Sequence, residues 1–455
     1  MEQTVEETER VRTGEGQTVV GDAPSAPSST AGPATSEKPT SEKPAPRTGG
    51  RALTADFVRV VLFAGVVIAH SVSGINTSPD VLRSAQLVGT LLHVTRYGFV
   101  AVTLFVLVLS MRGRTMSPVQ FWRRRFGLIV VPYLVWTVVY VVSDHLLIAD
   151  DPFPGVGQFF EDLGWSVVAG TGKYQLYFLL ISMQIYLFFP VISWILERTI
   201  RHPWLLLAGA AAIQILTFVT YQWLPRPSGS AWDQVYEHAW KTLPMYTLFV
   251  AIGGLTALHL DQVQSWLRAH VVSVVSACAL GTAASIAVYL WMTEPGEVPW
   301  QATTPWNPSL LLWLVSGVVL LWLVAMGWDA LRVGGRKVGA RAVSYATIRA
   351  FGVFAIHPLI LDILNRVGFT PDLYEWFPRS AATRSTVLVI VVLVLSLIAV
   401  DLLLRTPAAK WLVARDRIPL RKKAPLQKKA PLQKKAPMQK EAPMQKKAPM
   451  QKEAR

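Results

Sequence analysis

Cysteine and charge are both scarce in this sequence. A single cysteine, Cys278, is present among 455 residues, so an intrachain disulfide framework and a cysteine-based metal site are excluded. Only 16% of the residues are charged, whereas 52% are hydrophobic, and the mean hydropathy is +0.36. Soluble domains of this size carry more charge than that. The composition therefore predicts an all-α polytopic membrane protein.

Several local signatures of catalysis are missing from the chain as well. It has no glycine-rich phosphate loop, no Gly-x-Ser-x-Gly nucleophile elbow and no His-Glu-x-x-His metal helix. No basic segment followed by an apolar stretch opens the chain, so we expect no cleavable signal peptide. These absences remove phosphate-loop enzymes, α/β-hydrolases and zinc-helix proteases from consideration.

The positive charge is distributed unevenly along the chain. The formal net charge is +15, and residues 417–455 supply most of it with thirteen Lys and Arg against two Glu. This tail contains five tandem copies of Ala-Pro-(Leu or Met)-Gln-Lys-(Lys or Glu), beginning at Ala424. Two interpretations fit it: a polybasic arm attracted to anionic lipid, or a solvated low-complexity tail. Neither interpretation indicates a nucleic-acid partner.

The chain divides into three segments by composition. Residues 1–50 are too poor in aliphatic residues to form a core, so we expect a disordered cytoplasmic tail. Residues 51–410 form the predicted membrane domain, and residues 411–455 the basic cytoplasmic tail. Ten apolar runs of bilayer length predict membrane helices at 53–74, 87–111, 126–147, 174–196, 203–223, 242–260, 270–292, 309–328, 346–365 and 385–406.

Basic residues in the short loops predict the orientation of these helices. Arg and Lys concentrate after the second, fourth and eighth helices, whereas the loops after the third and seventh are acidic. Because cytoplasmic loops carry the excess of Lys and Arg, both termini are expected in the cytoplasm. An even number of helices is consistent with that arrangement.

The first predicted helix carries three polar groups in an otherwise apolar run. Arg59 and His70 are eleven residues apart, which returns the second side chain to within roughly 20° of the first, about 16.5 Å along the axis. Asp56 lies near the same stripe, three residues before Arg59. Polar groups inside membrane helices usually face a protein interior or a wet cavity. The alternative is that Arg59 snorkels to the headgroups and His70 is interfacial.

Other polar groups lie near or inside predicted helices. The run Arg123–Arg125 before the third helix is either a positive-inside signal or a cradle for a phosphorylated ligand. His357 precedes Pro358, whose ring frees a backbone carbonyl that the imidazole can satisfy; the alternative is a place in a reaction cavity. His93 and Arg96 in the second helix are expected to face the interior, without an assigned task.

Taken together, these residues are similar to a known family. The matching positions are Asp56, Arg59 and His70 in the first helix, Arg123–Arg125 followed by Pro132-Tyr133-Leu134-Val135-Trp136, Tyr177-Phe178-Leu179 followed by Gln184, and Gly352 through His357-Pro358. Over residues 51–406 the chain resembles the integral-membrane acyltransferase 3 family. Members are bacterial proteins with about ten membrane helices that acylate hydroxyls, often on cell-envelope glycans.

The resemblance implies a multi-pass O-acyltransferase of the plasma membrane. Its partners would be the lipid bilayer, acyl-CoA as co-substrate and a glycan or lipid-linked hydroxyl acceptor, with no bound cofactor and no metal. His70 would act as general base, or form a covalent acyl-histidine, and Asp56 would orient Arg59. Arg59 and Arg123–Arg125 would bind the anionic head of the donor. Arg96, Tyr177, Gln184 and His357 are the remaining residues expected to line the cavity.

Two other functions remain open from the sequence. The same polar stripe would serve a lipid or glycan translocator that performs no chemistry, and an inactive relative is the third possibility. Release of CoA that depends on an acceptor would distinguish the enzyme from the translocator.

Overall fold

The structure is a computed structural model that describes residues 49–114, 116–149, 153–336 and 338–419. Almost all of the predicted N-terminal tail, residues 1–50, lies outside the described residues. So do residues 420–455, which contain the five repeats. No strand occurs in the described part of the chain.

Ten helices among the described residues are long and apolar enough to cross a membrane. They are Thr54–Ile75, Pro79–Met111, Pro118–Leu147, Tyr177–Arg198, Pro203–Trp223, Ser230–Leu258, Val271–Met292, Trp300–Val333, Ala340–Arg366 and Ala381–Leu403. The predicted all-α membrane fold with ten spanning helices is thereby confirmed. The cytoplasmic placement of both termini stays a prediction.

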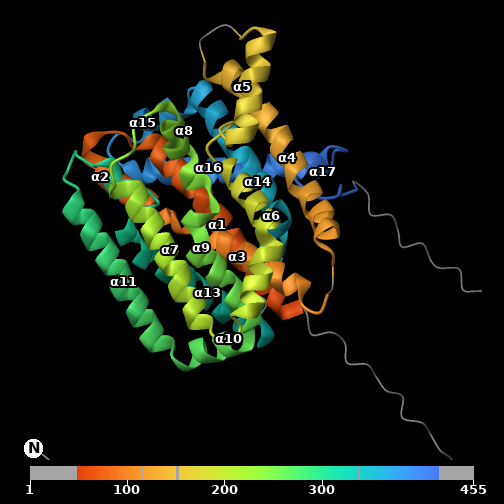
Figure 1. The fold of residues 1–455 in the computed structure, drawn as a ribbon. Helices are drawn as coiled ribbons and strands as arrows, with labels where there is room; N and C mark the ends of the chain where they lie inside the picture. The colour runs from red at the N-terminus through yellow and green to blue at the C-terminus, as the bar shows by residue number, and fades with distance from the viewer. Residues whose placement is uncertain (1–48, 115, 150–152, 337, 420–455) are drawn as a thin grey trace, which may run out of the picture. The chain divides into compact units, whose positions relative to one another are not determined.

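Several spans are made of more than one helical element, and short helices connect them (Figure 1). The elements are α1 (Gly49–Ile75), α2 (Pro79–Leu92), α3 (Val94–Met111), α4 (Pro118–Leu147), α5 (Val156–Ala169), α6 (Tyr177–Arg198), α7 (Pro203–Trp223), α8 (Ser230–His238), η1 (Ala239–Lys241), η2 (Leu243–Tyr246), α9 (Thr247–Leu258), α10 (Leu260–Ala269), α11 (Val271–Met292), α12 (Trp300–Thr303), η3 (Pro308–Leu310), α13 (Leu311–Val333), α14 (Ala340–Arg366), α15 (Phe369–Trp376), α16 (Ala381–Leu403) and α17 (Ala409–Leu412).

The third span begins eight residues before its predicted start at 126. Pro118 occupies the first turn of α4, where its missing N–H is not needed, and the Ser117 hydroxyl accepts a hydrogen bond from the Gln120 N–H. These two local signals start the helix early. The run Arg123–Arg125 therefore lies inside α4, and its prediction as a segment before the helix was wrong.

Three of the described spans are interrupted, and two of these interruptions concern the site. The second span breaks at His93 between α2 and α3, and the His93 Nε2 lies 2.8 Å from the Thr303 carbonyl oxygen. The sixth span is divided into α8, η1, η2 and α9, with Trp240 and Lys241 in η1. Irregular backbone at membrane depth is tolerated where it is buried in protein or lines a cavity. Both interruptions border the cavity described below.

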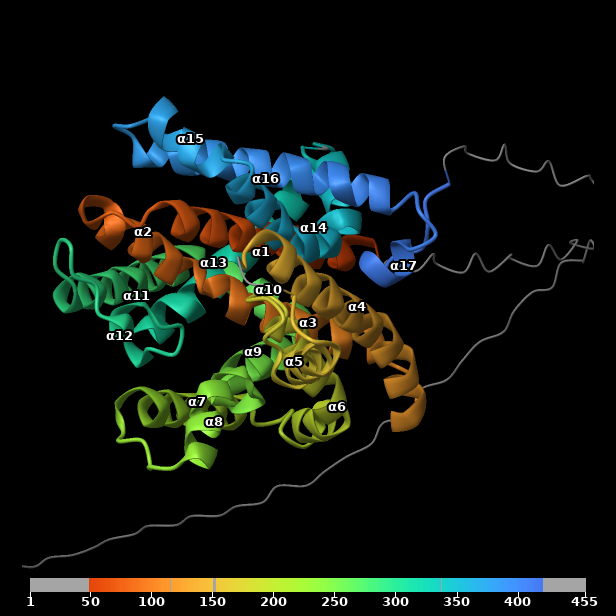
Figure 2. The same cartoon turned by 90° about the horizontal axis from the view of Figure 1, so that it is seen from above.

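The helix α1 occupies the middle of the described helices. It contacts α2, α3, α13, α14 and α16, and Figure 2 shows it between α16 on one side and α3 on the other. The helices α3 and α9 are in close contact at Gly253. A Cβ atom there would lie 2.1 Å from the Ala101 carbonyl oxygen, so only glycine permits this approach. The close approach holds α3, which carries Arg96, against α9.

Candidate active site

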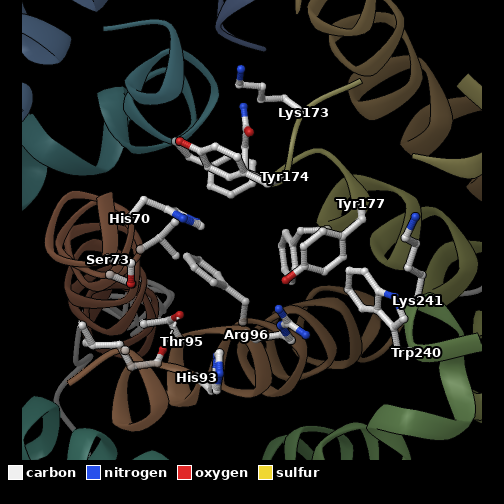
Figure 3. Close-up of a pocket in the computed structure, with 18 of the residues that line it drawn as sticks. His70, Ser73, His93, Thr95, Arg96, Lys173, Tyr174, Tyr177, Trp240 and Lys241 are labelled. Atoms are coloured by element: carbon white, nitrogen blue, oxygen red, sulfur yellow. Dashed lines mark hydrogen bonds between the residues drawn. The ribbon is translucent and has the colours of Figure 1, made fainter. Parts of the chain in front are cut away.

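A cavity of about 540 Å³ lies beside the C-terminal part of α1. Its walls come from α1, α2, α3, residues 170–175, α6, η1 and α14. Figure 3 shows His70, Arg96, Tyr174 and Tyr177 around this space, although they come from four separate segments. Most polar lining groups therefore meet only through the tertiary fold.

His70 packs against two other rings at the wall of this cavity. Its ring centroid is 4.3 Å from that of Tyr174 and 5.6 Å from that of His357. The His357 Nδ1 lies 2.8 Å from the Phe354 carbonyl oxygen, so this nitrogen carries the proton and donates it. Although we expected His357 to line the cavity, it is fully buried and supports His70 through the stacked rings.

Tyr174 supplies a hydroxyl next to His70. Burial, together with the neighbouring carboxylates of Asp362 and Asp144, raises the pKa of the Tyr174 hydroxyl, so it stays protonated and can donate a hydrogen bond. The preceding residue, Lys173, anchors this segment, because its Nζ lies 2.7 Å from the Asp144 Oδ1 and 2.9 Å from the Asp362 Oδ2. The anchored loop thereby holds the Tyr174 ring against His70.

Arg96 enters the cavity from the first turn of α3. Its guanidinium carbon lies 4.8 Å from the ring centroid of Tyr177 and 5.1 Å from that of Trp240. The Arg96 Nη1 is buried and has no hydrogen-bond partner among the described residues. Arg96 and Tyr177 were both predicted to line the cavity, and the structure places both there.

Comparison with known proteins places this architecture in a family. The model of the acyltransferase domain matches residues 54–405, which is most of the chain. The chain belongs to the acyltransferase 3 family. No curated protein and no solved structure matched it. With its ten spanning helices, the protein is a multi-pass membrane acyltransferase.

The other predicted site residues of this acyltransferase lie nearer the N-terminal end of α1. Arg59 is paired with Asp56, with 3.6 Å between the Nη1 and Oδ1 atoms. Its further electrostatic neighbours are Tyr186, Arg125 and Arg415. Arg59 thus has two further arginines and one carboxylate among its electrostatic neighbours, so positive charge is in excess there.

The three consecutive arginines of α4 separate in space. Arg125 donates a hydrogen bond from its Nη2 to the Ser110 hydroxyl at 3.0 Å and is one of the electrostatic neighbours of Arg59. Arg123 and Arg124 are exposed. On a helix, successive residues are rotated by about 100°, so three in a row cannot face one ligand. Of the predicted donor-binding run, the structure brings only Arg125 toward Arg59.

We expected Gln184 to line the cavity, but it lies outside the lining. Its Nε2 donates to the Lys241 carbonyl at 2.8 Å, and its Oε1 accepts from the Leu243 N–H at 3.2 Å. These bonds satisfy backbone groups that the interruption between η1 and η2 frees. Gln184 therefore fixes η1 in position and places Trp240 at the cavity.

A ring of four phenylalanines closes the cavity toward Arg59. The phenylalanine ring consists of Phe63, Phe99, Phe178 and Phe354, one each from α1, α3, α6 and α14. Successive centroids around it are 4.4, 5.2, 6.0 and 5.5 Å apart. Three of its members line the cavity beside His70. The cavity thus reaches His70 but not Arg59, and the polar stripe expected along α1 is interrupted at Phe63.

Sequence reasoning missed four residues of this site: Lys173, Tyr174, Trp240 and Lys241. The first two lie in a loop and the last two in a single 3₁₀ turn, so no helical periodicity singles them out. One feature of the sequence could have indicated this part of the site: Lys173 lies in the short segment directly before a long apolar helix.

Proposed function

We propose that this acyltransferase transfers an acyl group from acyl-CoA to a hydroxyl of a cell-envelope acceptor, either a glycan or a lipid-linked molecule, at the plasma membrane. The observation that carries the proposal is the place of His70 at the wall of a polar cavity, supported by the buried ring of His357. A neutral imidazole has a free ring nitrogen that can accept the proton of a hydroxyl, which is what a general base requires.

In the proposed reaction the acceptor hydroxyl binds next to His70. The imidazole removes the hydroxyl proton as the oxygen attacks the carbonyl carbon of the thioester, which gives a tetrahedral intermediate. Collapse of this intermediate breaks the carbon–sulfur bond, forms the ester and expels the CoA thiolate, which takes the proton from the imidazolium. The Tyr174 ring centroid lies 4.3 Å from that of His70, and its protonated hydroxyl would donate a hydrogen bond to the developing oxyanion.

The separation of the two polar groups on α1 suits a long donor. Arg59 and His70 lie about 16.5 Å apart along the helix, so they cannot bind the same small group. Acyl-CoA carries its phosphates at one end and its thioester at the end of a flexible pantetheine arm. The phosphates would bind Arg59 together with its electrostatic neighbours Arg125 and Arg415. The arm would then pass the phenylalanine ring, which has to open for the thioester to reach His70.

The test uses purified protein with labelled acyl-CoA and candidate acceptors. His70→Ala should lower acceptor-dependent CoA release by about 10²- to 10⁴-fold, the usual contribution of a general base. His202→Ala is the matched control, because His202 is exposed before α7. Full transfer by His70→Ala would refute the assignment of the base.

Arg59→Ala tests the donor site separately. It should raise the apparent KM for acyl-CoA about tenfold or more, as expected for the loss of a charged hydrogen bond. Arg124→Ala serves as its control, since Arg124 is exposed on α4. An unchanged KM in Arg59→Ala would contradict this role. Export of an unmodified glycan that requires the protein, without any release of CoA, would favour the translocator instead.

A further inference from the structure

The cavity beside His70 is lined by basic side chains without matching acids. Arg96, Lys173, Lys241 and two histidines line it, and none of the described lining residues is Asp or Glu. Lys173 is neutralised by Asp144 and Asp362, and its ammonium points away from the space in Figure 3. The charges that remain to be accounted for in the lining are those of Lys241 and Arg96.

Lys241 is turned toward backbone instead of the cavity centre. Its Nζ donates a hydrogen bond to the Ala169 carbonyl at 2.7 Å and lies 3.4 Å from the His238 Nδ1. The Lys241 ammonium is thus held at the edge of the cavity by these two groups, with the Glu237 carboxylate as a further electrostatic neighbour. It adds positive potential there without being the group that a ligand would meet first.

Arg96 is the cation left for a ligand. In the described part of the chain no carboxylate forms an ion pair with it. The rings of Tyr177 and Trp240 pack near its guanidinium, and its Nη1 is buried without a hydrogen-bond partner. A buried charge without a counter-ion costs several kcal/mol, and a guanidinium presents a fork of donors that matches an oxyanion. The hydroxyls of Tyr246 and Tyr177 already interact with this guanidinium, and an anionic ligand would supply the counter-charge and an acceptor for the Nη1.

We propose that the acceptor of this acyltransferase carries a carboxylate or phosphate, and that Arg96 binds this oxyanion while the acceptor hydroxyl lies at His70. This inference rests on the proposed function, because it takes the cavity to be the acceptor site. The phosphates of the donor do not explain Arg96, since the arginines around Arg59 lie on the other side of the phenylalanine ring. The site would then favour acceptors that carry a negative charge over neutral molecules with a similar hydroxyl.

Binding is measured first, with protein that cannot turn over. His70→Ala protein is melted with methyl β-D-glucuronide, with glucose 6-phosphate and with methyl β-D-glucoside, at constant ionic strength. The two anionic sugars should raise the Tm, whereas the neutral glucoside should not. Arg96→Gln in the same background should abolish the shift, and Arg96→Lys should retain part of it. Equal shifts for charged and neutral sugars, or a shift that survives Arg96→Gln, would overturn the proposal.

Transfer is measured second, with the protein carrying His70 and labelled acyl-CoA. Arg96→Gln should lower the ratio of kcat/KM for the glucuronide over the glucoside by about 30-fold, which corresponds to the loss of about 2 kcal/mol from one buried charged pair. An equal fall in kcat for both sugars would place Arg96 at the reacting carbonyl and refute the acceptor role. Anion binding without any transfer would refute the proposed function alone, and transfer without charge preference would refute only this inference.

Discussion

Replacing Lys173 by methionine should damage the active site without touching a reacting group. The Lys173 ammonium bridges Asp144 on α4 and Asp362 on α14, and the same loop presses Tyr174 against His70. Methionine preserves the length and the apolar stem of the side chain but removes its charge. Two carboxylates are then left facing each other without a counter-ion.

The expected loss follows from the exposure of the three groups. Breaking a buried ion pair by removing one partner costs about 3–5 kcal/mol. Lys173 and Asp362 are 8% and 15% exposed, whereas Asp144 is 39% exposed and can regain water. Most of the penalty therefore comes from Asp362, and we expect Lys173→Met to lower the free energy of unfolding by about 2–3 kcal/mol.

The assay combines unfolding of the detergent-solubilised protein with acceptor-dependent CoA release. Because the loop also positions Tyr174, kcat should fall while the apparent KM for acyl-CoA stays unchanged. Adding Asp362→Asn to Lys173→Met should recover at least about half of the lost stability, since removing both partners of a buried pair is far less costly than removing one. Arg332→Met is the control, because it breaks the partly exposed ion pair with Asp329 and should lower the free energy of unfolding by only about 0.5 kcal/mol.

Two outcomes would refute this reasoning. Wild-type stability and kcat in Lys173→Met would show that the bridge neither holds the loop nor compensates buried charge. A double variant as unstable as the single one would show that the loss comes from packing and not from an unpaired carboxylate.

Two further predictions concern helix packing and the phenylalanine ring. Gly253→Ala should lower the free energy of unfolding by about 1–3 kcal/mol and reduce expression of folded protein, because its Cβ would lie 1.3 Å closer to the Ala101 oxygen than the 3.4 Å of an ordinary contact. Gly209→Ala is the control and should have little effect, since no atom lies within 4 Å of its Cβ. Equal stabilities of the two variants in a melting assay would contradict the packing argument. Phe178→Ala should increase release of CoA in the absence of acceptor, because water would reach a bound thioester through the opened phenylalanine ring. An unchanged rate without acceptor would show that the ring does not separate the cavity at His70 from the region around Arg59.

The ten membrane spans could be predicted from the sequence because their signal is local. An apolar run of about 20 residues is sufficient to define each one. The second, third, sixth, eighth and ninth spans begin six to twelve residues before their predicted starts, and the other predicted ends agree with the structure within five residues. The exceptions arose where polar or helix-starting residues extend a helix beyond its apolar core, as Pro118 does in α4. The ion pair between Asp56 and Arg59 could also be predicted from the sequence, because residues three positions apart share a face of a helix.

The composition of the cavity depended on the tertiary structure. Tyr174 and Trp240 lie more than 60 residues apart, yet both line the same space, and no repeating pattern marks either. Helical geometry alone predicts that Arg59 and His70 face the same side of the first helix. The interruption between them depends on Phe99, Phe178 and Phe354, which three other helices bring against Phe63. Periodicity reports which way a side chain faces, but only long-range packing decides what it meets there.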